Sequence, residues 1–167
     1  GKTAGRADAY LALRTKAEAG DAVAQQHLFV QDLGLHRFTF SQGELRYAGL
    51  KDKLPAELRK RAEQHLVDLQ YAELTGALRA QLPKLDRSEY SRRYAELSLL
   101  FFAAGKIPGS YHGTGLLSAV LRHAQQTRDA ALFGQALEAF KQRTAGDARY
   151  ARSIDRYTKQ LEELRGN

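Results

Sequence analysis

Apolar side chains recur at helical spacing, three or four residues apart, over most of this chain. The pattern is clearest in the last third, where short breaks separate three such segments. The segments are Leu116–Ala124, Leu132–Phe140 and Tyr150–Leu164. Alternating runs of valine, isoleucine and threonine, from which a sheet would be built, are nearly absent. The chain therefore predicts an all-α fold.

Helix start and stop signals divide the chain into short lengths. The predicted stops are Gly20, Gly34, Gly105 and Gly146, and the predicted caps are Asp21, Ser41, Asp86, Thr114 and Asp129. Ser41 and Glu44 have the spacing of a capping box, with Phe40 and Leu45 as a hydrophobic staple around it. We expect a short helix to begin at Ser41 and to end near Lys51.

These signals predict about six to eight helices, arranged as antiparallel hairpins in a tetratricopeptide-like array or an irregular bundle. One long helix is expected from Pro55 to about Gln81, and the helix that ends at Ala104 is expected to be the most buried. We interpret residues 1–5 as a disordered end or a remnant added for expression. Residues 6–167 then form a single helical domain, with a candidate subdivision near 82–86.

Composition excludes several classes of protein. With 43% hydrophobic and 27% charged residues, the chain resembles an ordinary soluble domain, and its 167 residues suffice for one core. It has no cysteine, which excludes disulfides and thiolate metal sites. No apolar run is long enough for a transmembrane helix. Because methionine is absent, we expect a processed form or a piece of a larger protein. The compartment (bacterial cytoplasm or envelope) and the oligomeric state stay open.

The formal charge is +7, which is compatible with nucleic acid, an anionic membrane surface or an acidic protein partner. The positive residues are spread along the chain rather than grouped in blocks. Their dispersion favours a simple role in solubility.

The glycine-rich segment 105–115 is the first candidate binding site. Its glycines would expose backbone N–H groups, and it leads into a helix N-terminus, which attracts anions. The side chains that would add contacts are Lys106, Ser110, Tyr111, His112 and Thr114. The segment matches neither a P-loop nor a dinucleotide motif, so a plain surface connector is favoured over a binding loop.

A basic stripe on the last helix is the second candidate. It consists of Arg149, Arg152, Arg156 and Lys159, with Tyr150 and Tyr157 beside it. Such a stripe would suit phosphates or an acidic helix. The alternative, which we favour, is a solvated helix edge paired with neighbouring carboxylates.

Metal binding, cofactor binding and catalysis have little support in the sequence. No two histidines have the four-residue spacing of a helical zinc motif, and no Ser–His–Asp pattern is visible. His27 shares a helix face with Val23 and Val30, which predicts a packed core histidine. We therefore expect no catalytic residue, no metal and no cofactor.

Two segments resemble helical repeats. TKAEAGDAVAQQHL (Thr15–Leu28) resembles the start of a Sel1-type repeat, although Phe29 follows where that family expects an early glycine. QALEAF (Gln135–Phe140) resembles the second helix of a tetratricopeptide repeat, although Arg143 stands at a small-residue position. The phrase at Asp129–Lys141 also resembles the helical extension of thioredoxin-fold proteins of the bacterial envelope. These resemblances imply stacked hairpins that bind a partner.

The leading functional hypothesis is a non-catalytic protein-interaction or structural module within a larger protein. Its partner would be a protein or peptide that binds near Tyr111, His112 and the Arg149 stripe. The alternative hypothesis is a basic helical nucleic-acid-binding protein. A third and less favoured one is an enzyme that uses the 105–115 segment.

Overall fold

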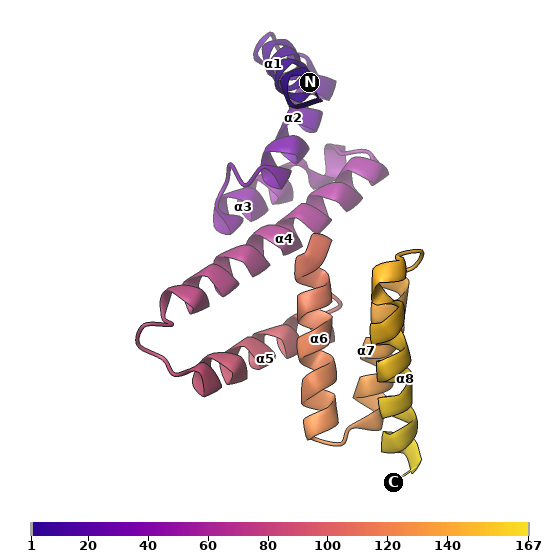
Figure 1. Ribbon diagram of the computed structural model, residues 1–167. Coiled ribbons are helices and arrows are strands. Elements are labelled where there is room, and N and C mark those ends of the chain that lie inside the picture. Colours follow the sequence, from indigo (N-terminus) through magenta and orange to yellow (C-terminus); the bar gives the residue numbers. More distant parts are fainter. Residues whose placement is uncertain (1, 167) are drawn as a thin grey trace. The chain divides into compact units, whose positions relative to one another are not determined.

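The computed structural model describes residues 2–166, and within them all regular secondary structure is helical (Figure 1). The α-helices are α1 (Lys2–Glu18), α2 (Ala22–Gly34), α3 (Phe40–Leu50), α4 (Ala56–Ala80), α5 (Arg87–Ala103), α6 (Ser110–Gln126), α7 (Ala130–Arg143) and α8 (Ala151–Gly166). Two 3₁₀ helices, η1 (Lys51–Lys53) and η2 (Ala148–Tyr150), join them. Neighbouring helices pack as hairpin-like pairs, which confirms the predicted all-α fold of stacked hairpins. None of these eight helices is long and apolar enough to cross a membrane.

The chain divides into two compact units, Gly1–Glu73 and Leu74–Asn167. The boundary falls inside α4, the long helix that the sequence predicts between Pro55 and Gln81. The first unit contains α1, α2, α3 and most of α4, and the second contains α5 to α8. Each unit has its own buried side chains.

The first unit is built around the inner face of α2. Val30 and Leu33 are fully buried there and belong to one apolar cluster with Leu54, which follows η1, and with side chains of α4. The whole cluster comprises Phe29, Val30, Leu33, Leu54, Leu58, Ala62 and Leu66. Each large side chain removed from water in this way contributes about 1.5–3 kcal/mol. The opposite face of α2 is open, so the prediction of a packed His27 is wrong: His27 is exposed, and Val23 beside it is 63% exposed.

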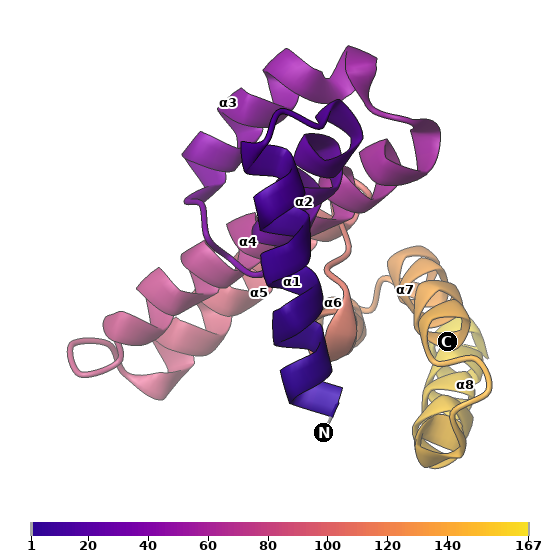
Figure 2. The same cartoon turned by 90° about the horizontal axis from the view of Figure 1, so that it is seen from above.

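Helix α1 pairs with α2 through a tight turn (Figure 2). Gly20 has a φ of +95°, a value that favours glycine, and Asp21 accepts a hydrogen bond from the Ala24 N–H at 2.9 Å. This stop and cap are where the sequence predicts them. The helix itself begins at Lys2 rather than at the predicted Arg6.

The start of α3 differs from its prediction by one residue, and its cap by two. Thr39, not Ser41, is the cap: its hydroxyl accepts from the Gln42 N–H at 3.2 Å. The Gln42 side chain accepts in return from the Thr39 N–H at 3.1 Å, which completes a capping box. Phe40 then donates its N–H to Glu73 of α4 at 2.8 Å. Leu45 is 77% exposed, so the expected staple does not form.

Gly43 brings α3 close to the core of the first unit. It is buried, and a Cβ built at this position would lie 2.7 Å from a methyl carbon of Leu33 and 3.2 Å from one of Leu66. Leu33 is itself fully buried, so its methyl group has little room to move away. The missing side chain of Gly43 therefore sets the distance between α3 and its neighbours.

The second unit is built around the α6–α7 pair. Along α6, Leu116, Leu117, Val120, Leu121 and Ala124 are all nearly inaccessible to solvent, and along α7 so are Phe133, Ala136, Leu137 and Phe140. Helix α8 lies along the other side of α7 (Figure 1), where Tyr157 meets the rings of Phe133 and Phe140 edge-on. Asp129 caps α7, as predicted. Asp147 caps η2, directly after the predicted stop at Gly146.

The prediction that α5 is the most buried helix is wrong. Leu100 is 70% exposed, and the fully buried side chains of α5 are Ser98 and Phe101. The buried positions of α6 and α7 are more numerous because each of these helices has a partner on both sides. Because α5 carries apolar residues around its whole circumference, some of these side chains stay exposed to solvent.

The imidazole ring of His65 in α4 packs against Gly34 at the end of α2. A Cβ at Gly34 would lie 3.0 Å from two atoms of the imidazole ring, so the ring occupies the space of the missing side chain. Burial lowers the pKa of His65 below 6.5, Arg61 and His36 lower it further, and Asp68 opposes them. The folded state of the first unit therefore favours the neutral imidazole.

We expect Gly43→Ala to destabilise the protein by about 1–3 kcal/mol, because the added methyl group overpacks the contact with Leu33 and Leu66. Gly49→Ala is the matched control in the same helix, where nothing lies within 4 Å of the added atom. That change should stabilise the helix by about 0.5–1 kcal/mol. Urea unfolding of the three proteins gives both values, and equal effects of the two substitutions would contradict the close contact.

The stability of the protein should fall as the pH drops below about 6.5, since the unfolded chain then binds a proton on His65 more readily than the folded chain does. The contribution is fully present above 6.5 and is lost as the pH falls through the lower pKa of the folded state. Urea unfolding from pH 7.5 to 5 measures this slope. His65→Gln should reduce it, and an unchanged slope in that variant would contradict the assignment.

Candidate functional site

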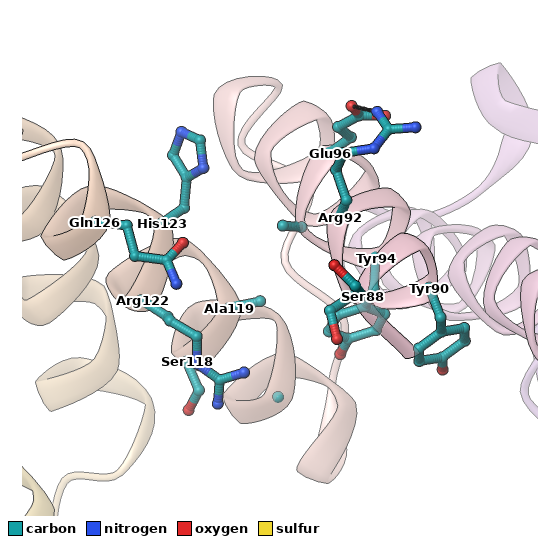
Figure 3. A pocket seen from close by; sticks show the side chains of 13 residues that line it. Ser88, Tyr90, Arg92, Tyr94, Glu96, Ser118, Ala119, Arg122, His123 and Gln126 are labelled. Carbon is teal, nitrogen blue, oxygen red and sulfur yellow. Dashed lines mark hydrogen bonds and ion pairs between the residues drawn. The ribbon is translucent and has the colours of Figure 1, made fainter. Parts of the chain in front are cut away.

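A groove of about 540 Å³ runs between α5 and α6 in the second unit (Figure 3). We call it the α5–α6 groove. The α6 wall comes from one face of that helix, at spacings of three and four residues, and the α5 wall comes from neighbouring positions between Ser88 and Glu96. The residues that line it are Ser88, Tyr90, Ser91, Arg92, Tyr94, Ala95 and Glu96 on α5, and Gly115, Ser118, Ala119, Arg122, His123 and Gln126 on α6.

Small side chains keep the groove open. Ser88, Ser91 and Ala95 follow one another along α5, and Ser118 and Ala119 stand on α6. Larger residues at these positions would fill the space between the two helices. The small side chains would let the main chain of another molecule approach the helix surfaces closely.

Two stacked tyrosines form part of the groove wall. The rings of Tyr90 and Tyr94 lie 6.3 Å apart and nearly parallel, at 15°. The Tyr94 hydroxyl reaches α6, where a Cβ at Gly115 would lie 3.3 Å from it. Gly115 therefore provides the space in which the tyrosine crosses from α5 to α6.

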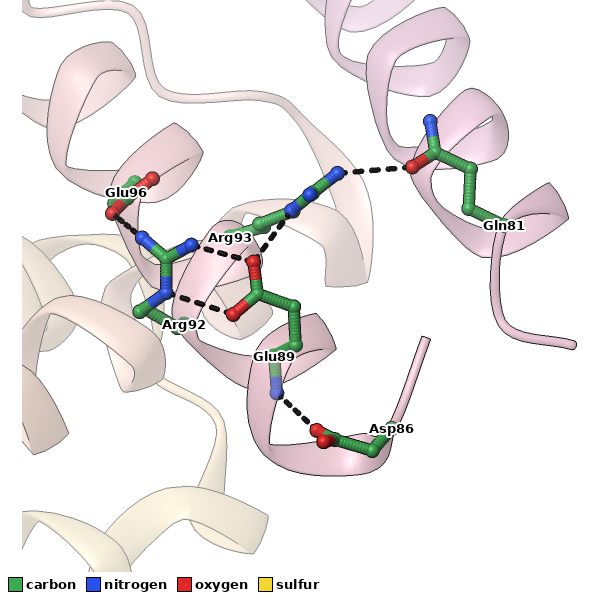
Figure 4. Close-up of polar contacts among 6 residues, drawn as sticks. All are labelled: Gln81, Asp86, Glu89, Arg92, Arg93 and Glu96. Carbon is green, nitrogen blue, oxygen red and sulfur yellow. Dashed lines mark hydrogen bonds and ion pairs between the residues drawn. The ribbon is translucent and has the colours of Figure 1, made fainter. Parts of the chain in front are cut away.

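An ion-pair network holds the charged side chains of α5 in place (Figure 4). Glu89 accepts hydrogen bonds from both Arg92 and Arg93, and Arg92 also pairs with Glu96. Arg93 donates to the Gln81 side chain at 3.0 Å, which links α5 to the turn before it. Hydrogen bonds from Arg92 and Arg93 lower the pKa of Glu89 to about 2. The positive charges of Arg92 and Arg93 are thus largely balanced by carboxylates of the same helix.

Arg122 of α6 differs from these arginines. Its guanidinium is exposed at the groove and makes no hydrogen bond or ion pair with any side chain in residues 2–166. The adjacent His123 imidazole is half-buried and likewise makes none within this part of the chain. In Figure 3, Arg122 and His123 extend from α6 among the labelled polar side chains of the groove. Arg122 is therefore a cation available to a ligand.

The glycine-rich segment is shorter and more closely packed than its sequence suggests. Helix α6 begins at Ser110, whose side chain lies outside the described part of the structure, and its cap is Gly109 rather than Thr114. Pro108 is buried, and a Cβ at Gly113 would meet the Pro108 carbonyl and the Arg143 guanidinium. These contacts are typical of an ordered connection between two helices.

The four other predicted residues of this segment lie around that connection. Lys106 is exposed ahead of α6, and Tyr111 is 74% exposed with its ring 4.2 Å from the ring of His112. Thr114 lies inside α6 and donates its hydroxyl to the Tyr111 carbonyl at 2.8 Å. The Thr114 hydroxyl is thus bonded within its own helix.

The predicted basic stripe lies on η2 and α8, on different elements from the glycine-rich segment. Arg149 binds both carboxylate oxygens of Asp147, and this pairing lowers the pKa of Asp147. The Arg156 guanidinium lies 5.1 Å from the ring centre of Tyr157. Arg152 and Lys159 are exposed. Arg152, Arg156 and Lys159 share one edge of α8 by their spacing, whereas Arg149 lies on η2 and pairs with Asp147.

The α5–α6 groove was not predicted from the sequence, because the apolar and charged stripes of the helices do not indicate it. The available signal was the recurrence of small residues at helical spacing on two successive helices, from Ser88 to Ala95 and from Gly115 to Ala119. Only the pairing of α5 with α6 shows that the two sets face each other. Within residues 2–166, no three acidic or histidine side chains gather closely enough to hold a metal ion.

Comparison of the chain with models of known protein families, with curated proteins and with solved structures found no match. The resemblances to Sel1-type and tetratricopeptide repeats thus stay predictions.

We expect the carboxyl group of Glu89 to titrate near pH 2 in the folded protein, against an ordinary value of 4.5. Because its pKa is lower in the folded state, the pairing stabilises the fold above about pH 4.5. The contribution is lost as the pH falls from there toward 2. Carbon NMR of the side-chain carboxyl groups measures the midpoint.

Arg93→Ala should move that midpoint upward, whereas Arg87→Ala at the start of the same helix should leave it in place. A midpoint above about 4 in the unaltered protein would show that the network does not persist in solution.

Proposed function

We propose that this protein is a non-catalytic protein-interaction module, and that its α5–α6 groove binds an acidic segment of a partner protein. The proposal is carried by one observation: a groove with small side chains along its walls and an unpaired cation, Arg122, at its edge. It follows the leading hypothesis from the sequence but moves the binding site from Tyr111 and Arg149 to the groove.

The dimensions of the groove suit a polypeptide. The residues that line the groove extend from Ser88 to Glu96 on α5 and from Gly115 to Gln126 on α6, which corresponds to roughly 12 and 17 Å of helix. About five residues of extended chain cover the longer of these lengths. The tyrosines supply rigid apolar surface, and the serines and Gln126 supply hydrogen-bonding groups. Tyrosine and arginine are enriched at protein interfaces for these reasons.

The charge of the second unit favours an acidic partner. Residues 74–167 contain 15 basic and 9 acidic side chains, a net charge of +6. Residues 1–73 contain 11 basic and 10 acidic side chains, a net charge of +1. Nearly all of the excess charge thus belongs to the unit that contains the groove. A positive field of this kind attracts an acidic surface and speeds its association.

Nucleic acid is the competing ligand, and the ion pairs remove some of the cations that it would require. Binding to a phosphate backbone depends on many cations that are free to replace counterions. Arg92, Arg93 and Arg149 are each paired with a carboxylate. A protein with one acidic segment requires fewer free cations, and Arg122 supplies one.

The state of Glu89 supports a binding role rather than catalysis. A carboxyl group with a pKa of about 2 stays ionised at neutral pH and holds two arginines in position. A general acid or base requires a pKa nearer to the working pH. The perturbed group beside the groove therefore behaves as part of a structural ion pair.

We expect a fluorescein-labelled peptide of about 12 residues, alternating glutamate and alanine, to bind the full chain. Arg122→Glu should weaken binding by at least about tenfold, which corresponds to about 1.4 kcal/mol. Arg152→Glu on α8 makes the same change of charge outside the groove and should alter the Kd by no more than about twofold. Fluorescence anisotropy at about 0.15 M salt measures all three proteins.

Two results would overturn the proposal. Equal losses in the two variants would show a non-specific response to net charge. Tighter binding of a single-stranded oligonucleotide, steeply dependent on salt and weakened by Arg152→Glu, would replace the acidic protein with nucleic acid.

A further inference from the structure

A second hollow, of about 440 Å³, opens on the first unit between α2, α3 and η1. Its apolar part is formed by Leu28 and Phe29 of α2, by Phe38 of the connection to α3, and by Leu50 at the end of α3. Phe29 is 6% exposed and belongs to the core, while Phe38 is half-buried at the surface. The hollow therefore leads from solvent to the aromatic edge of the core.

Phe29, Phe38 and Arg46 follow one another along the aromatic wall of the hollow. The rings of Phe29 and Phe38 lie 5.9 Å apart. The Arg46 guanidinium of α3 lies over the Phe38 ring, 4.8 Å from its centre. Phe38 is thus in contact with the core through Phe29 and with a cation through Arg46. An arginine bound to a ring in this way keeps its N–H groups free to bind an anion.

The surroundings of the hollow are held by hydrogen bonds. Gln26 of α2 donates its side-chain amide to the Lys53 carbonyl at 3.2 Å, which joins α2 to η1. Gln25 donates to the Ala17 carbonyl at 3.1 Å and so joins α2 to α1. The elements that form the hollow are therefore fixed before any ligand arrives, as is usual for binding pockets.

The charge at the rim of the hollow is positive. Arg46 and Lys53 have no carboxylate partner among residues 2–166. The acidic residue of the rim, Asp32, accepts a hydrogen bond from Tyr10 at 2.7 Å and lies 3.6 Å from Arg37. Its charge is thus balanced inside the first unit, whereas the two cations face solvent.

We infer that this hollow is a second docking site, which binds an aromatic side chain flanked by carboxylates on a partner polypeptide. The aromatic ring would enter the apolar part beside Phe38 and remove a large apolar area from water. The flanking carboxylates would pair with Arg46 and Lys53, since charge-assisted hydrogen bonds to arginine are strong and directional. The inference does not depend on the α5–α6 groove, because the hollow belongs to the other unit.

The test uses the full chain and a fluorescein-labelled peptide with a central phenylalanine and four glutamates on each side. The control peptide has alanine at the centre. We expect the phenylalanine peptide to bind at least about tenfold more tightly than the alanine peptide. Arg46→Glu should weaken its binding by at least about tenfold, and Lys53→Glu should weaken it in the same direction. Circular dichroism establishes that each variant is folded.

Two control variants distinguish binding at this hollow from a general effect of charge and from binding at the α5–α6 groove. Lys60→Glu changes the same charge at an exposed position of α4 outside the hollow, and should leave the Kd within about twofold. Arg122→Glu should likewise leave the Kd of the tighter of any two binding events of the phenylalanine peptide unchanged. Failure of the proposed α5–α6 groove site and failure of this site are therefore distinguishable.

Four results would overturn the inference. They are no binding at about 1 mM peptide, equal affinity for the phenylalanine and alanine peptides, equal losses in Arg46→Glu and Lys60→Glu, and self-association of the chain that Arg46→Glu abolishes. The last result, measured by sedimentation, would assign the hollow to a second copy of this chain.

Discussion

Burial of one face of α6 against α7 is the interaction on which the second unit depends. Leu117, Val120 and Phe133 are fully removed from water along this contact. With that face used, α6 has only its opposite side left for α5, and this side carries Gly115, Ser118 and Ala119. Two helices that meet through small side chains leave space between them. The α5–α6 groove is therefore a consequence of where the large apolar residues of α6 are placed.

The two outer helices of this unit, α5 and α8, differ in how their charged side chains are arranged. Helix α8 covers α7 with a narrow seam that includes Tyr157 and turns its charged residues to solvent. Helix α5 instead keeps its charged face ordered through the pairing of Glu89 with Arg92 and Arg93. Because that pairing balances the charges of Arg92 and Arg93, Arg122 on α6 becomes the cation that distinguishes the groove.

The two units differ in what they offer a partner. The first has nearly balanced charge and presents an aromatic hollow beside Phe38, with Arg46 and Lys53 at its rim. The second carries most of the net charge and presents the α5–α6 groove, which is lined by small and polar side chains as well as by the two tyrosines. Under the two proposals above, each unit would bind an acidic segment through its own site.

The sequence by itself determined the helical class, the long α4 and most helix boundaries, because caps such as Asp21 and Asp129 and stops such as Gly20 act within a few residues of chain. At the start of α3 the pattern predicts Ser41 as the cap, whereas the structure has Thr39 there. Only the tertiary structure decided which apolar faces are covered, that α5 is partly open, and that small residues of α5 and α6 face each other. Those outcomes depend on contacts between residues distant in the chain, which periodicity along one helix does not contain.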